Sequence, residues 1–125
     1  MTFPGLACGK AGSASWGVIM KLLDFVRAAK AERDAMALTY SAANAGSAVG
    51  GHLAKAKLTD AQRKEVTAAI DQVLTDAFYT MMLALDGAAS LGTIQQSYRI
   101  LMEDGSEISA GDGSLESAAF QVFQQ

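Results

Sequence analysis

The sequence predicts an α+β domain built from a pair of long helices, a C-terminal β-hairpin and a short final helix. Two observations carry this prediction. Apolar residues recur with helical spacing between residues 59 and 85, and two short alternating segments flank the pair Asp104-Gly105. A chain of 125 residues is the size of one domain that can bury a core of its own. We therefore expect a single domain.

The first fifteen residues are rich in glycine, alanine and serine and contain Pro4, the only proline of the chain. We interpret residues 1–15 as an irregular N-terminal arm and residues 16–125 as the α+β domain. The arm has no basic segment followed by an apolar one, so we expect no secretory signal. Cys8 is the only cysteine, which excludes an intramolecular disulfide and fits a reducing, cytoplasmic setting.

The spacing of apolar residues predicts a first long helix over residues 15–42. Arg33 lies on the same face as its apolar residues, and three roles are open for it. Its stem covers the core while its head reaches water, or it pairs with Asp71 or Asp76, or it binds a ligand. The apolar residues of this face are Leu22, Phe25, Val26, Ala29, Met36 and Tyr40.

A run of small residues over 44–51 follows, and it indicates either a flexible connection or a close approach of backbones. The glycines do not make a phosphate-binding loop, because His52 and Leu53 follow where such a loop needs Lys and Ser or Thr. We expect residues 52–57 to form a short helical turn.

The second long helix is predicted to begin after Thr59 and to end at Gly87. Thr59 and Gln62 have the spacing of a capping box, and Gly87 supplies a left-handed helix stop. Tyr79 and Leu83 lie opposite the main apolar stripe, which makes the second half of this helix apolar nearly all round. Such a helix needs cover on more than one side, from its own chain or from a partner. The stripe comprises Ile70, Val73, Leu74, Ala77, Phe78, Met81, Met82 and Leu85.

After a loop over 87–92, the alternation over 93–103 predicts a strand. The pair Asp104-Gly105 predicts a two-residue hairpin turn into a strand over 106–109, with Leu101 opposite Ile108. A final helix follows, for which Asp112 or Ser114 is the expected N-cap.

Composition excludes several classes of function. A net charge of −3 and a pI near 5.0 give no basic surface for nucleic acid and no electrostatic membrane anchor. No segment approaches the roughly 20 apolar residues that a membrane span requires. The expected partner is another protein or a second copy of the chain, with no nucleic acid and no membrane.

The sequence offers no convincing catalytic or metal site. His52 is the only histidine and has no second ligand near it, and no GxSxG motif accompanies it. Asp71 and Asp76 point away from each other on a helix, so they cannot flank one bond. The acidic residues between 103 and 116 do not have the spacing of a calcium loop. We therefore expect no catalytic residue, no metal and no cofactor, and we favour a non-enzymatic role.

The best candidates for a contact site lie on the second long helix and in the loop after it. Serine and glutamine side chains in and after this loop offer hydrogen-bonding groups, and Gln96 and Tyr98 would share one face of the predicted strand. The candidate ligand or partner contacts are Tyr79, Leu83, Ser90, Gln95, Gln96 and Tyr98.

The segment from Leu85 to Gly92, with the strand, hairpin and acidic-capped helix after it, resembles small bacterial proteins. Some domains of that kind resemble immunity proteins that neutralise a toxin, and the resemblance assigns no role to any residue here. Three functions stay open at this point. The first is a protein-interaction or self-associating domain, the second is an immunity protein with an acidic surface, and the third is a small enzyme or ligand-binding domain that uses the loop.

Overall fold

The structure, a computed structural model, describes residues 15–40 and 46–124. The described chain forms the helices α1 (Ser15–Thr39), α2 (Ala48–Ala56), α3 (Asp60–Leu85) and α4 (Ser114–Phe123) and the strands β1 (Ile100–Leu101) and β2 (Glu107–Ser109). The fold is α+β, as predicted. Of the predicted arm, residues 1–14, including Cys8, lie outside the described residues, and Ser15 is the first residue of α1.

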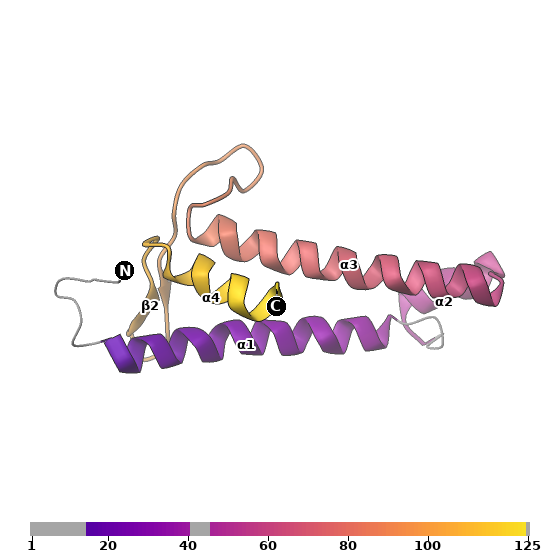
Figure 1. Cartoon of the computed structure of the whole chain (residues 1–125), viewed down its shortest axis with the longest axis horizontal. Coiled ribbons are helices and arrows are strands. Elements are labelled where there is room, and N and C mark those ends of the chain that lie inside the picture. Colours follow the sequence, from indigo (N-terminus) through magenta and orange to yellow (C-terminus); the bar gives the residue numbers. More distant parts are fainter. Residues whose placement is uncertain (1–14, 41–45, 125) are drawn as a thin grey trace.

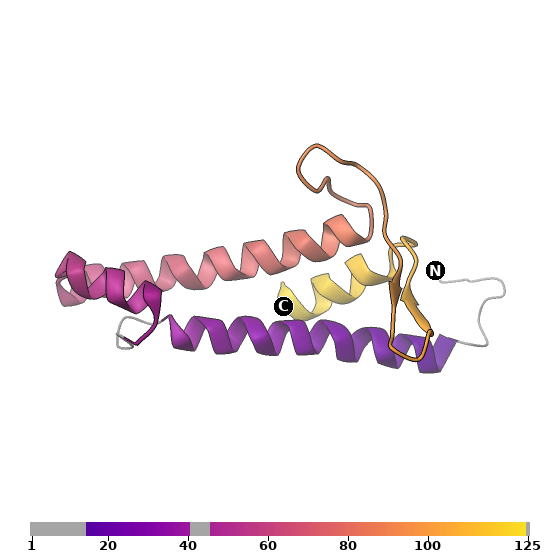
Figure 2. The same cartoon turned by 180° about the vertical axis from the view of Figure 1, so that it is seen from behind.

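The two long helices α1 and α3 lie side by side and antiparallel (Figure 1). Helix α4 is inserted between them at one end, where β1 and β2 also cross α1 (Figure 2). Helix α2 lies at the opposite end. We call the end with α4 and the hairpin the base, and the end with α2 the tip.

The hydrophobic core lies in the base. Side chains of α1, α3 and α4 meet there, and the rings of Phe78 and Phe123 stack with their centroids 6.4 Å apart. Because α4 reaches only part of the way along the long helices, every described apolar side chain that is fully buried belongs to the base half. These are Leu22, Val26, Met82, Ala84, Ile108, Leu115, Ala118, Ala119 and Phe123.

Both ends of α3 have the predicted caps. The backbone N–H of Thr59 donates to the Gln62 side chain at 2.9 Å, and the Thr59 hydroxyl accepts from the Gln62 N–H at 3.1 Å. At the other end Gly87 has φ 84, and the N–H groups of Gly87 and Ala88 bond the carbonyls of Ala84 and Leu83. This pair of hydrogen bonds is the Schellman motif, which satisfies carbonyl groups that the helix end leaves without a partner.

The first helix and the connection after it differ from the prediction. Helix α1 ends at Thr39, and residues 41–42 of the predicted helix lie outside the described residues. Helix α2 begins at Ala48, earlier than expected, because the Ser47 side chain caps it by accepting from the Gly50 N–H at 2.9 Å. Part of the small-residue run is therefore helical, with Gly50 buried inside it.

The hairpin exists, but the predicted strand over 93–103 and its register are wrong. Strand β1 has only two residues, and Leu101 lies opposite Glu107. The loop is one residue longer than predicted, since the Gly105 N–H bonds the Met102 carbonyl and Gly105 takes the left-handed φ of 89. Ile108 is then an extra residue between the two pairs, a bulge, and its side chain is 2% exposed.

The N-cap of α4 is also different from the prediction. The cap residue is Gly113, which has no side chain, and neither Asp112 nor Ser114 takes this position. Instead the carboxylate of Asp86, at the end of α3, accepts from the N–H groups of Gly113 at 3.3 Å and Glu116 at 2.8 Å. Asp86 is 5% exposed, so one buried side chain joins the end of α3 to the start of α4.

Residues 88–99 form a loop that leaves α3 at the base and arches beside it (Figure 1). We call this loop the finger. Leu91 and Ile94 exchange backbone hydrogen bonds of 2.8 and 3.0 Å, so the fingertip is a tight turn with Gly92 at φ 62.

The finger returns to the base beside its starting point. The Tyr98 N–H bonds the Leu85 carbonyl at 3.0 Å. Ser97 packs so tightly that a Cβ atom built on Gly111 would lie 2.4 Å from its own Cβ, and one built on Gly87 would lie 3.0 Å away. Three segments therefore cross at Ser97, and two of them require glycine.

Candidate functional site

The outer side of α3 carries apolar side chains that the rest of the described chain leaves open. Val73 is 63% exposed and Met81 is 45% exposed, and the exposed Ala77 lies between them. Successive members of this set are four residues apart, so they form one strip along the helix. The predicted apolar stripe of α3 is therefore divided. Leu74, Phe78 and Met82 are half-buried or buried, while this strip faces solvent.

The finger turns this strip into a groove. Ser90 and Leu91 form one wall against the outer side of α3, and the space between them measures about 410 Å³. Ala84, which is 1% exposed, forms the floor beside the finger. We call this the α3 groove, and its lining residues are Val73, Asp76, Ala77, Thr80, Met81, Ala84, Ser90 and Leu91.

The fingertip adds further exposed apolar surface next to the groove. Leu91 is 39% exposed and Ile94 is 54% exposed. Since the tight turn at Gly92 fixes both residues, their side chains are held on an ordered loop beside α3. Leu91 also lines the groove, so the apolar strip of α3 and the fingertip meet at this residue.

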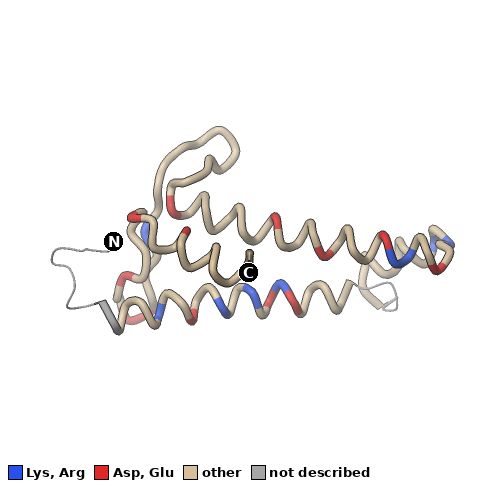
Figure 3. Tube along the Cα trace, viewed as in Figure 1, with Lys and Arg blue, Asp and Glu red and all other residues tan. Residues whose placement is uncertain are grey.

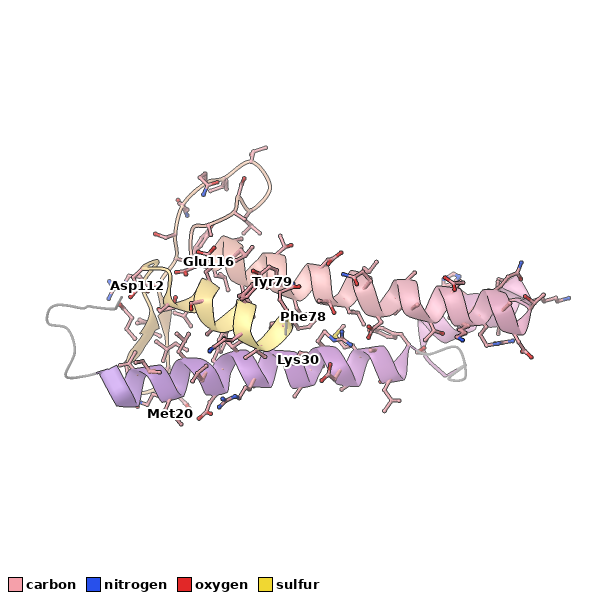
Figure 4. The ribbon with its side chains drawn as sticks, in the orientation of Figure 1. Met20, Lys30, Phe78, Tyr79, Asp112 and Glu116 are labelled. Carbon is pink, nitrogen blue, oxygen red and sulfur yellow. The ribbon has the colours of Figure 1, made fainter. Side chains whose placement is uncertain are left out.

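The two predicted contact residues on α3 lie away from this groove. Tyr79 is half-buried and packs against the core with Phe78 (Figure 4), and Leu83 is also half-buried. The side of α3 that the sequence singled out is thus partly covered within the chain. The open strip comes from residues that the sequence assigned to the core.

The four predicted contact residues of the loop do not converge on one place. Ser90 lies in the wall of the groove. The Gln95 side-chain amide donates to the Gly87 carbonyl at 2.7 Å, so it holds the finger, and Gln96 is exposed. Tyr98 is half-buried, and because residues 95–99 are not a strand, the expected strand face shared by Gln96 and Tyr98 is absent.

Sequence reasoning missed Val73, Ala77 and Met81 as surface residues, together with Leu91 and Ile94. One signal for the first three was available. The apolar stripe of α3 is wider than a single neighbouring helix can cover. The fingertip gave no such signal, because its conformation depends on backbone hydrogen bonds that no spacing of residues reveals.

A second groove lies towards the tip, between α1 and α3, and measures about 540 Å³. Arg33, which is 7% exposed, lies next to it and pairs with Asp71, one of the three roles that the sequence left open. Its guanidinium donates to Asp71 Oδ1 and to Thr75 Oγ1, each at 2.5 Å. Arg33 Nε is also 3.0 Å from Asp34 Oδ1, although its N–H is not aligned for a hydrogen bond. The guanidinium thus ties α1 to α3.

Asp34 completes this polar cluster. Lys30 donates to its carboxylate at 2.9 Å. That hydrogen bond, followed by the charges of Lys30 and Arg33, lowers the pKa of Asp34 below its usual value. Lys30, Arg33, Asp34 and Asp71 are therefore engaged with one another, which favours a structural role for this cluster.

Charge is unevenly distributed along the molecule (Figure 3). From residue 86 to the C-terminus, at the base, the acidic residues are Asp86, Glu103, Asp104, Glu107, Asp112 and Glu116, and the basic residue is Arg99. At the tip, the segment 52–65 has the basic residues Lys55, Lys57, Arg63 and Lys64 and the acidic residues Asp60 and Glu65. The base is therefore acidic and the tip is basic.

Within residues 15–40 and 46–124, no three His, Cys, Asp or Glu side chains come together as a metal site. His52 is exposed on α2. Among the described helices, none combines the length and the apolar character that crossing a membrane requires.

Comparison of the chain with protein-family models, curated proteins and solved structures finds no match.

Proposed function

We propose that this chain is a protein-interaction domain that binds an apolar helical segment in the α3 groove. The observation that carries the proposal is the exposed apolar strip of Val73, Ala77 and Met81, which lines one groove together with the exposed fingertip residue Leu91. Contiguous exposed apolar surface next to a groove is typical of a protein interface. A helix is the natural occupant, since amphipathic helices bind other proteins in shallow apolar grooves.

The composition of the groove supports a protein partner over a small substrate. Its polar side chains, Asp76, Thr80 and Ser90, are spread along the groove and do not surround one point. A substrate site needs a concave pocket in which polar groups converge on the reacting atoms. The groove is open along its length, which suits an extended partner.

The expected energy of such an interface is appreciable. Val73 and Met81 each keep about half or more of their surface exposed. Full burial of a side chain of this kind contributes on the order of 1.5–3 kcal/mol, so each has roughly half of that still to gain. The fingertip residues would add a similar contribution, which supports specific binding after the cost of association is subtracted.

Site-specific photocrosslinking in living cells tests this proposal. A photoreactive phenylalanine derivative replaces Ala77 in the groove or, as a matched control, Ala31, an exposed alanine on α1. We expect a discrete crosslinked protein adduct from position 77 and none from position 31. Absence of an adduct at 77, or equal adducts from both positions, would overturn the proposal.

An immunity protein is a second candidate, and the acidic base supports it. Apart from the buried Asp86, five acidic residues stand against one basic residue from residue 87 onwards, a surface suited to a basic partner. Binding of that kind weakens as salt rises, because exposed charges are screened. An adduct from photoreactive residues at the base, with none from position 77, would favour this candidate.

A further inference from the structure

We propose that the occupant of the α3 groove is the α3 helix of a second copy, running antiparallel, with Ala77 of both copies at the crossing point. This inference rests on the proposed function and names its partner. The three observations behind it are the symmetry of the exposed strip, the position of the finger and the distribution of charge.

The exposed strip is self-complementary. A two-fold axis through Ala77 places each residue of one α3 against the residue equally far on the other side of Ala77 in the second copy. Val73 then meets Met81 of the second copy, and Met81 meets Val73. The two most exposed apolar side chains of the strip therefore pair with each other. The small side chain of Ala77 lets the helix axes approach closely at the centre.

The finger has a place in the same arrangement. It arches beside the base half of its own α3, and in the antiparallel pair this position adjoins the tip half of the second α3. Val66 and Ile70 lie in that half and are only half-buried in one chain. The exposed side chains of Leu91 and Ile94 would gain cover from them, so each copy contributes a wall to the groove of the other.

Charge favours the antiparallel orientation over the parallel one. Antiparallel pairing brings the basic tip of each copy towards the acidic base of the other, whereas parallel pairing would place like charges together. The dipoles of the two α3 helices also oppose each other in this orientation. Both effects are screened by salt, so they select the orientation, and apolar burial supplies the affinity.

The molar mass in solution is the first test, and the full chain is used. One chain has a mass of 13.0 kDa, so sedimentation equilibrium at micromolar concentration should give about twice that value. Ala77→Arg should return the mass to that of one chain and weaken association at least 100-fold. The matched control Ala31→Arg should remain dimeric. A wild-type monomer throughout the micromolar range, or equal effects of both substitutions, would overturn the inference.

Cysteine pairing tests the orientation without depending on the arginine variant. In a Cys8→Ser background, one chain with Val73→Cys is mixed with a mass-tagged chain with Met81→Cys and oxidised gently. The antiparallel pair predicts that mixed disulfides predominate. Predominance of disulfides between identical chains would show parallel pairing and overturn the inference.

The photocrosslinking experiment separates failure of this inference from failure of the proposed function. An adduct at position 77 with twice the mass of the chain supports both proposals. An adduct of another mass, together with a monomer in sedimentation, keeps the interaction function and overturns the second copy as its partner. No adduct at position 77 overturns both.

Discussion

Asp86 has a role at the ends of two helices. It is the C-cap residue of α3, and its carboxylate accepts hydrogen bonds from the N–H groups of Gly113 and Glu116 at the start of α4. Because Gly113 has no side chain, this carboxylate replaces the missing local cap. The negative charge also suits the N-terminus of α4.

Replacing Asp86 should therefore destabilise the base. We expect Asp86→Ala to lower the free energy of unfolding by about 2 kcal/mol, since it removes a helix cap and leaves the N–H groups of Gly113 and Glu116 without this acceptor. Asp112→Ala is the matched control. Asp112 is exposed, and among the described residues it accepts from Ser114 alone, so its loss should cost under about 1 kcal/mol.

Urea unfolding followed by circular dichroism measures both changes. Equal costs for the two alanine variants would show that the local cap expected from the sequence, at Asp112, matters as much as the distant one.

The different outcomes for caps show what sequence can reveal at the level of residues. The capping box of Thr59 and Gln62 is local, so its spacing predicts it correctly. The cap of α4 comes from a residue 27 positions before Gly113. No local pattern contains that information, because it depends on how the end of α3 meets the start of α4.

At the level of elements, the hairpin is joined to α1 by its turn. Ser106 donates to Asp104 through both its hydroxyl, at 2.7 Å, and its backbone N–H, at 2.9 Å. Lys21 of α1 donates to the Ser106 hydroxyl oxygen at 3.1 Å and lies 3.6 Å from the Asp104 carboxylate. The hydrogen bonds from Ser106, with a smaller effect from Lys21, lower the pKa of Asp104 below its ordinary value of 3.8.

This shift predicts a dependence of the hairpin on pH. A carboxyl group with a lowered folded pKa stabilises the fold above its unfolded pKa of about 3.8, and that contribution disappears as pH falls through the folded value. We expect Ser106→Ala to raise the pKa of Asp104 towards 3.8, with the titration followed by carboxyl carbon NMR. Ser114→Ala, which removes a similar hydroxyl beside Asp112, should leave the pKa of Asp104 unchanged. An unchanged pKa of Asp104 in Ser106→Ala would contradict this account.

The elements were predictable where periodicity determines them. Helices α1 and α3 follow from apolar spacing, and the pair Asp104-Gly105 correctly places the hairpin. The register was not predictable, because Gly105 can serve as the left-handed residue in loops of either length. The alternation over 93–99 was misleading. It belongs to the finger, whose turn at Gly92 and hydrogen bond from Gln95 fix a conformation outside any sheet.

At the scale of the whole molecule, the core is concentrated at one end. Helix α4 fills the space between α1 and α3 only in the base, and towards the tip the polar cluster around Arg33 connects the two helices. The candidate site follows from the same asymmetry. Covering by α4 selects which part of the α3 stripe is buried, and the strip from Val73 to Met81 remains open. Sequence could predict the width of the stripe but not the direction from which α4 approaches.

This asymmetry predicts a gradient of local stability along α1. Amides over residues 22–27, which lie beside the core, should exchange with deuterium at least about tenfold more slowly than amides over residues 35–39, a difference of about 1.4 kcal/mol in opening free energy. Hydrogen exchange followed by NMR measures it, and α1 lies outside the proposed dimer contact. Uniform protection along α1 would contradict the inferred distribution of packing.

The anchoring of the finger has a consequence for how this protein can change. Both ends of the finger are fixed at the base, where Tyr98 bonds Leu85 and Ser97 packs against Gly87 and Gly111. Further along the finger, the Gln95 side chain holds it to the Gly87 carbonyl, and no hydrogen bond between the fingertip at Gly92 and the helices is seen in the described part of the chain. Lengthening a loop whose ends are already held together costs little, about 0.6 kcal/mol for each doubling of its length. Insertions at the fingertip could therefore give related chains new specificities while the helices below stay the same.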